Sequence, residues 1–118
     1  MPKLIELETH TDHRGSLTVI EKILPFDIKR VFYLYDLKLK RGGHRHKKTI
    51  QAIIALNGSC EVFVENSNEK KTFLLDNNKC LILNPEDWHT MNNFSKGTIL
   101  LVLASEYYDT NDYIEEGY

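Results

Sequence analysis

Two histidines separated by one residue carry the most reactive side chains in this sequence. His44 and His46 lie in the stretch 42–48, which reads Gly-Gly-His-Arg-His-Lys-Lys. If this stretch is a β-strand, residues two apart point to the same face, and both imidazoles reach into the space that this face encloses. Three roles are compatible with such a pair: it could ligate a metal, exchange protons with a substrate, or form a polar patch exposed to solvent.

A metal site would need further ligands beside the two imidazoles, because catalytic metal sites usually combine three nitrogen or carboxylate ligands. The fifth residue after His46 is Gln51, and a neutral amide oxygen is a weak ligand for a transition metal. His89 is the candidate for a third imidazole. Because Gln51 stands where a ligand carboxylate would be needed, we expect neither a metal nor another cofactor at this site.

Acid and base chemistry agrees better with the residues around the pair. Imidazole titrates near neutral pH, so it can take up a proton and return it. Lys48 would continue the same-face series of His44 and His46, and a nearby cation lowers the pKa of an imidazole and keeps it neutral. Arg41 offers a bidentate fork for phosphate or carboxylate. This pattern predicts a site for an anionic ligand that contains a carbonyl group.

Short strands separated by turn signals must position these residues, since no segment has a convincing helical period. The run 50–56 is apolar nearly throughout, as in a strand buried on both faces, which disfavours an exposed histidine pair. Asn57-Gly58 after that run predicts a hairpin with a partner strand at 60–65. The apolar run 99–104 predicts a central strand.

Further strands are expected along the rest of the chain. They cover residues 4–8, 17–20, 28–37, 71–75 and 79–83, the last two forming a pair about the turn 76–78. Ten or so strands predict an all-β fold, a sandwich or a jelly-roll barrel, as one domain over residues 1–118. A short irregular or helical segment is expected after Ser105.

The composition agrees with a globular domain of 118 residues. A formal net charge of −2 excludes a strongly basic nucleic-acid-binding protein, but not a local basic pocket for phosphate. There is no apolar run of transmembrane length and no signal peptide, so we expect no membrane association. Cys60 and Cys80 have no metal-site spacing and predict buried, reduced thiols in a cytoplasmic protein.

Two groups of residues are similar to known motifs. His44-X-His46 with Gln51 and Gly58 is similar to the first cupin motif with its glutamate replaced, and Pro85 with His89 and Asn93 is similar to the second. Further matching stretches follow in collinear order over nearly all of the chain: 12–17, 25–33, 41–47, 56–59, 88–89, 93–95, 101–105, 108–109 and 112–114. With these stretches the sequence resembles the cupin sugar-nucleotide 3,4-ketoisomerases, which act on dTDP-4-keto-6-deoxyglucose.

The resemblance implies a cupin jelly-roll barrel, a homodimer that exchanges N-terminal strands, and catalysis without a metal. It implies that His44 and His46 are the catalytic pair and that Arg41 contacts phosphate. We expect His44 to be the base at carbon and His46 to be its partner. Arg45 between them should point away from the pocket. Phe32 stands where some family members have tyrosine, so a hydroxyl is missing there.

Four more residues are candidates for binding the substrate. Arg14 and Arg30 could bind phosphate or sugar hydroxyls, and Lys48 and Gln51 could stabilise an enediolate oxygen. Two rival functions stay open, because a fold does not fix a function. One is a nucleotide-sugar-binding protein without activity, and the other is a 3,5-epimerase on a similar barrel.

Overall fold

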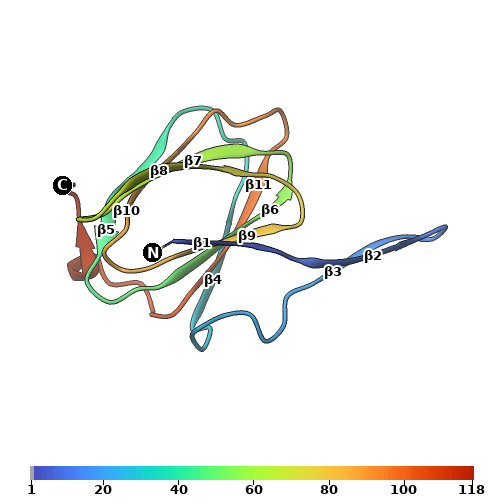
Figure 1. Cartoon of the computed structure of the whole chain (residues 1–118), viewed down its shortest axis with the longest axis horizontal. Helices are drawn as coiled ribbons and strands as arrows, with labels where there is room; N and C mark the ends of the chain where they lie inside the picture. Colours follow the sequence, from blue (N-terminus) through green and yellow to red (C-terminus); the bar gives the residue numbers. More distant parts are fainter. Residues whose placement is uncertain (1) are drawn as a thin grey trace.

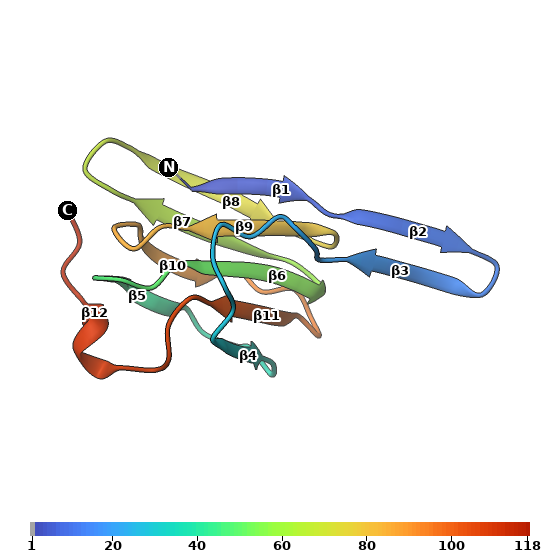
Figure 2. The ribbon, with the colours of Figure 1, turned by 90° about the horizontal axis from the view of Figure 1, so that it is seen from below.

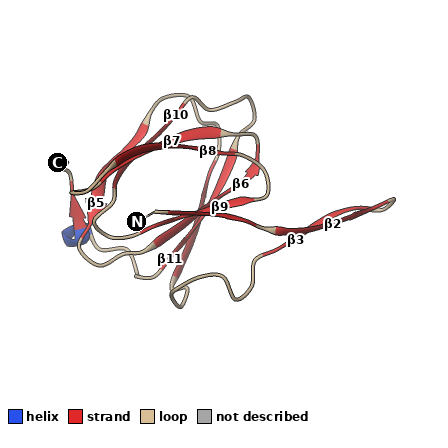
Figure 3. Cartoon of the chain, in the orientation of Figure 1, coloured by secondary structure: helices blue, strands red, loops and turns tan. Residues whose placement is uncertain are grey.

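The computed structural model describes residues 2–118, in which the regular structure is β-strand apart from a single turn of 3-10 helix near the C-terminus (Figure 3). The elements are β1 (Lys3–Glu6), β2 (Glu8–Asp12), β3 (Gly15–Val19), β4 (Arg30–Leu34), β5 (Arg41–His46), β6 (Gln51–Asn57), β7 (Cys60–Glu65), β8 (Lys70–Leu75), β9 (Lys79–Leu83), β10 (Trp88–Asn92), β11 (Ile99–Ala104), η1 (Thr110–Asp112) and β12 (Tyr113–Ile114). No helix in this part of the chain is long and apolar enough to cross a membrane.

Two antiparallel five-stranded sheets face each other and enclose the core of a cupin-type barrel, as Figure 1 shows. One sheet has the strand order β1-β9-β6-β11-β4, and the other has the order β12-β5-β10-β7-β8. Strands β2 and β3 pair with each other as a separate hairpin, which projects from the barrel (Figure 2). The predicted all-β jelly-roll architecture is therefore confirmed.

Strand β6 is buried on both faces, as its apolar sequence predicts. Ile53 and Ala55 point into the core between the two sheets. Ala52 and Ile54 belong to a second cluster on the opposite face, which the partly buried side chains Ile20, Ile23, Leu24 and Phe26 cover. Strand β11 lies between β6 and β4, so the predicted central strand is also confirmed.

The predicted hairpin at Asn57-Gly58 is wrong, because this turn carries the chain from one sheet to the other. Strand β6 pairs with β9 and β11, whereas β7 pairs with β8 and β10. Gly58 has φ +75°, and a Cβ there would lie 2.5 Å from Oγ1 of Thr98, so the turn packs tightly against the loop before β11. The predicted pairing of 71–75 with 79–83 is wrong for the same reason, since β8 and β9 belong to different sheets.

Several strands have bounds that differ from the expectation, most of all in the segments 17–20 and 28–37. The predicted strand 28–37 is ordered as a strand only over β4, and Asp36 has the left-handed φ of +54°. The strand expected at 17–20 begins earlier, at Gly15, because the turn between β2 and β3 comprises only His13 and Arg14. Both cysteines are buried free thiols, as predicted.

Candidate active site

Strand β5 carries the two histidines and lies between β10 and β12. His44 is directly opposite His89 of β10, and His46 is directly opposite Tyr113 of β12. Residues that face each other across an antiparallel pair share one face of the sheet. The topology therefore gathers three imidazoles and a phenol on one face, although they come from three separate segments.

The ring distances confirm this cluster. The centroids of His44 and His46 are 5.2 Å apart, and His89 lies 5.0 Å from His44. The ring of Tyr113 lies 5.0 Å from His44 and 4.7 Å from His46. His89, the candidate for a third imidazole, therefore lies beside the pair. Within residues 2–118, no group of three or more His, Cys, Asp or Glu side chains is arranged to hold a metal ion.

A β-bulge at the start of β5 sets the side on which Arg41 lies. The pairing with β10 shifts between His89 and Thr90, where Gly42 and Gly43 have φ angles of +90° and +84°. Arg41 consequently lies opposite Met91, a buried core residue, and so shares the face of the histidines. Regular alternation would have turned Arg41 to the other face of the strand.

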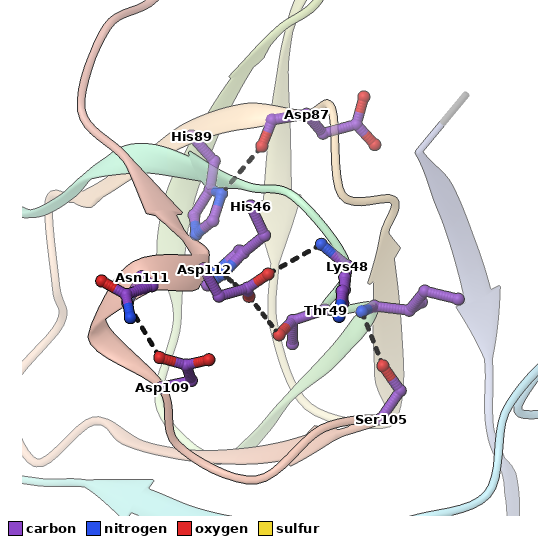
Figure 4. A network of polar contacts seen from close by, with 10 residues as sticks. His46, Lys48, Thr49, Asp87, His89, Ser105, Asp109, Asn111 and Asp112 are labelled. Atoms are coloured by element: carbon purple, nitrogen blue, oxygen red, sulfur yellow. Dashed lines mark hydrogen bonds and ion pairs between the residues drawn. The ribbon is translucent and has the colours of Figure 1, made fainter.

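Asp112 lies next to His46 and is buried at 8% exposure. Its Oδ2 is 2.9 Å from Nδ1 of His46 and accepts a hydrogen bond from the hydroxyl of Thr49. Its Oδ1 accepts a hydrogen bond of 2.7 Å from the backbone N–H of Lys48 (Figure 4). Burial alone would raise the pKa of Asp112, but these hydrogen bonds outweigh it and lower that pKa, so the carboxylate is ionised.

Burial keeps the imidazoles neutral. It lowers the pKa of His44 to about 4, with a smaller contribution from the neighbouring His46. It also lowers the pKa of His89 to about 4, although the Asp87 carbonyl, 3.1 Å from Nδ1 of His89, opposes the shift. Burial lowers the pKa of His46 as well, against the opposing effect of Asp112. Neutral imidazole is the form that accepts a proton, so the cluster is suited to base catalysis.

Arg30 supplies a positive charge close to this cluster. Its guanidinium lies 5.6 Å from the ring centroid of Tyr108 and 5.3 Å from that of Phe32. The ring of Tyr108 in turn lies 5.9 Å from Tyr113. The Nε atom of Arg30 is buried and has no hydrogen-bond partner among the described residues. Arg30 is therefore held by aromatic rings and keeps hydrogen-bonding capacity for a ligand.

A cavity of about 290 Å³ opens beside His44. Its lining consists of Gly42, Gly43, His44, Tyr108, Thr110, Tyr113 and Glu115. The C-terminal segment thus provides one wall of the cavity and β5 provides the other. The volume admits a ligand group of about the size of one sugar ring.

Two of the predicted binding residues do not lie on the face of the histidines of their own chain. Arg14 is at the tip of the β2–β3 hairpin, far from β5 (Figure 2), where it pairs with Asp12 at 2.7 Å. Lys48 lies beyond the end of β5 and is exposed, so the expected same-face series His44, His46, Lys48 is wrong. Gln51 begins β6 and is 5% exposed, on the same inward face as Ile53.

Arg45 and Trp88 form hydrogen bonds to the C-terminal tail. Arg45 points away from the histidines, as expected, and its Nε donates to the carbonyl of Glu116 at 2.9 Å. Its guanidinium lies 4.7 Å from the ring centroid of Tyr118. The indole N–H of Trp88 donates to the carbonyl of Glu115 at 2.9 Å. These contacts fasten the segment that carries Asp112 and Tyr113, two site residues whose roles sequence reasoning missed.

The chain is similar to known proteins over nearly its whole length. The family model described as "FdtA: WxcM-like, C-terminal" matches residues 1–118. A TDP-4-oxo-6-deoxy-alpha-D-glucose-3,4-oxoisomerase from Aneurinibacillus thermoaerophilus is 44% identical over 119 residues, which cover 97% of this chain and 86% of that protein.

Solved structures with similar sequences have the same fold. A 3,4-ketoisomerase from Helicobacter canadensis is 40% identical with a TM-score of 0.91, over 98% of this chain and 90% of that one. A histidine-to-asparagine variant of the 3,4-ketoisomerase QdtA from Thermoanaerobacterium thermosaccharolyticum, in complex with TDP-4-keto-6-deoxyglucose, is 42% identical. Its TM-score is 0.91, over 98% of this chain and 87% of that one.

Proposed function

The chain belongs to the FdtA family, and from this membership and the geometry of its histidines we propose that it is a sugar-nucleotide 3,4-ketoisomerase. Its substrate is dTDP-4-keto-6-deoxyglucose, and its product is a dTDP-3-keto-6-deoxyhexose. The observation that carries the proposal is the pair of neutral imidazoles, 5.2 Å apart on one face of β5 and next to a cavity.

The reaction exchanges a ketone and a hydroxyl between neighbouring carbons and needs no external oxidant. The carbonyl at carbon C4 acidifies the hydrogen on C3, and a base removes that hydrogen as a proton. The electrons of the broken C–H bond form the double bond of an enediolate. A proton is then delivered to C4, the oxygen on C4 is protonated, and the hydroxyl on C3 loses its proton to become the new ketone.

The residues of the cluster have different roles in this reaction. His44 lines the cavity and is the base at C3, and His46 exchanges protons with the sugar oxygens. Arg30 and Arg41 carry positive charge on the same side and bind the diphosphate or stabilise the enediolate. Gln51, buried on the inward face of β6, is a further candidate as a hydrogen-bond donor to the sugar.

Turnover of the keto sugar tests the proposal. Purified protein is incubated with dTDP-4-keto-6-deoxyglucose, and the sugar signals are followed by proton NMR. The proposal predicts a new 3-keto sugar nucleotide at a rate proportional to the protein concentration. Binding without turnover would indicate a sensor and would overturn the proposal.

The projecting hairpin supports a homodimer with exchanged N-terminal strands. An isolated two-stranded hairpin is marginally stable in water, and Leu17 on this hairpin is 60% exposed. A second copy would cover Leu17 and would give Arg14 a place at the partner's substrate. Light scattering after size-exclusion chromatography should give the mass of two chains, and a monomer would contradict this part of the proposal. We also propose a cytoplasmic location, which the buried free thiols of Cys60 and Cys80 support.

A further inference from the structure

The carboxylate of Asp112 is fixed in one orientation by three hydrogen-bond donors. The hydroxyl of Thr49 and the backbone N–H of Lys48 come from the bend that follows β5, and the third donor is the ring of His46. Figure 4 shows Asp112 lying between His46 on one side and Lys48 and Thr49 on the other. Both oxygens are occupied, so the carboxylate has one well-defined contact with the imidazole.

This contact determines which nitrogen of His46 carries the proton. An ionised carboxylate only accepts hydrogen bonds, so Nδ1 of His46 must be the donor. In a neutral imidazole the other nitrogen is then unprotonated. That nitrogen, Nε2, is buried and has no hydrogen-bond partner among the described residues. It is therefore a free proton acceptor on the face where the imidazole rings gather.

We propose that Asp112 is a positioning residue that holds His46 in the Nδ1–H tautomer and so leaves Nε2 available to accept a proton from the substrate. This role rests on the proposed isomerase function. Asp112 does not touch the substrate; it acts through the orientation and the tautomer of His46. The same arrangement stabilises the imidazolium that forms when Nε2 takes up a proton, because the negative charge lies 2.9 Å from Nδ1.

The other groups near His46 do not set its tautomer. Arg30 disfavours a charge on His46 but makes no hydrogen bond to its ring. His44, His89 and Tyr113 meet the ring by aromatic contacts, with centroids 4.7–6.5 Å away. Among the described residues, Asp112 is thus the single hydrogen-bond partner of the His46 ring that the structure assigns.

The tautomer can be measured directly in the wild-type protein without substrate. Long-range ¹H–¹⁵N correlation spectra of ¹⁵N-histidine-labelled protein distinguish a protonated Nδ1 from a protonated Nε2. The proposal predicts that His46, assigned by its loss in His46→Asn, has a protonated Nδ1 and a free Nε2 at neutral pH. A protonated Nε2 in the neutral ring would overturn it.

The variant Asp112→Asn reverses the tautomer if the proposal is right. The amide nitrogen would stand where Oδ2 now lies and would donate to Nδ1, which forces the proton of His46 onto Nε2. We expect kcat to fall by about 10²–10⁴-fold, in the range seen for an aspartate-to-asparagine change beside a catalytic histidine in another enzyme class. KM should stay within about threefold, since substrate contacts are unchanged.

Asp109→Asn is the matched control. Asp109 lies three residues earlier, caps η1 by accepting from the N–H of Asn111, and makes no hydrogen bond or ion pair with His46 among the described residues. It should keep the wild-type tautomer and kcat. An Asp112→Asn protein with wild-type kcat would overturn the proposal, as would a loss of kcat with the tautomer unchanged. If the wild type turned over no keto sugar, the proposed function would fall, but the spectrum recorded without substrate would still decide whether Asp112 sets the tautomer.

Discussion

Gly42 lies directly against the backbone of His89. A Cβ on Gly42 would be 2.8 Å from the carbonyl oxygen of His89 and 3.2 Å from Cα of Thr90. Gly42 also has φ +90°, in the region that side chains disfavour. The close approach of β5 to β10 at the bulge, and with it the contact between His44 and His89, depends on the missing side chain.

Gly42→Ala should damage both stability and activity. The new methyl group must push β5 away from β10, and the backbone must tolerate an unfavourable φ, at a combined cost of about 2–4 kcal/mol. We expect a lower midpoint of thermal unfolding and a fall in kcat/KM of about tenfold or more. Gly15→Ala is the control: Gly15 also has a positive φ, of +136°, but nothing lies within 4 Å of a Cβ there. Equal loss of kcat/KM in the two variants would refute the role of the close approach.

His44→Asn should abolish isomerisation and leave nucleotide binding nearly intact. Asparagine is close in size to imidazole but cannot take up a proton, so the base at carbon is lost. We expect kcat to fall by about 10³-fold or more, with the affinity for dTDP by calorimetry unchanged within about twofold. A variant that still converts the keto sugar at near the wild-type rate would show that His44 is not the base.

Lowering the pH should destabilise the protein over a range that the pKa values of its buried imidazoles set. The pKa of His89 is about 4 in the folded protein, against 6.5 for an exposed histidine, so between these values the unfolded chain binds more protons than the folded one. The free energy of unfolding should therefore fall as the pH drops below about 6.5, by about 2 kcal/mol at pH 5 for His89. Asp112 does not act in this window, because its pKa lies below its ordinary value of 3.8.

Urea unfolding at neutral pH and at about pH 5 measures this effect. His89→Gln should show a smaller loss between the two pH values, since the buried imidazole is gone. A wild-type protein that is equally stable at both would contradict the burial of neutral histidines. The low pKa of His44 also predicts that kcat/KM stays level as the pH falls through 6.5 and declines only nearer 4.

Arg45→Ala should lower kcat although Arg45 does not face the site. Without the guanidinium, the Glu116 carbonyl loses its hydrogen bond and Tyr118 keeps only the hydrogen bond to the Glu86 carbonyl, so the segment that carries Tyr113 opens more often. We expect faster amide exchange in residues 112–116 and a fall in kcat of about three- to tenfold. Lys70→Ala, which removes an exposed lysine from its ion pair with Glu65, should leave both unchanged. Unaltered exchange in the Arg45 variant would show that the tail is held by other contacts.

The sequence was sufficient to predict the histidine pair and the strand behind it. Alternation along β5 predicts that His44 and His46 share a face, and the apolar run of β6 predicts a strand buried on both sides. The pairing of strands was harder to predict. Asn57-Gly58 makes the same tight turn whether the chain returns along its own sheet or crosses to the other, so local turn chemistry does not decide between a hairpin and a crossing.

The position of Asp112 beside His46 could not be predicted from the sequence, for a different reason. It lies 66 residues after His46, in a one-turn helix followed by a two-residue strand. Segments this short have no periodicity, and their place follows from tertiary contacts such as those of Arg45 with Glu116 and of Trp88 with Glu115. The side of β5 on which Arg41 lies could not be predicted either, because it depends on a bulge that alternation alone does not predict.

The most direct test of the central claim is the position of the label when the wild-type protein acts on dTDP-4-keto-6-deoxyglucose in deuterated water. Proton NMR reports the identity of the product and the carbons that have exchanged. A 3,4-ketoisomerase using the histidine pair predicts a 3-keto product with deuterium at C3 of recovered substrate and at C4 of product, and none at C5. Exchange at C3 and C5 with the ketone still at C4 would identify an epimerase and would contradict the account.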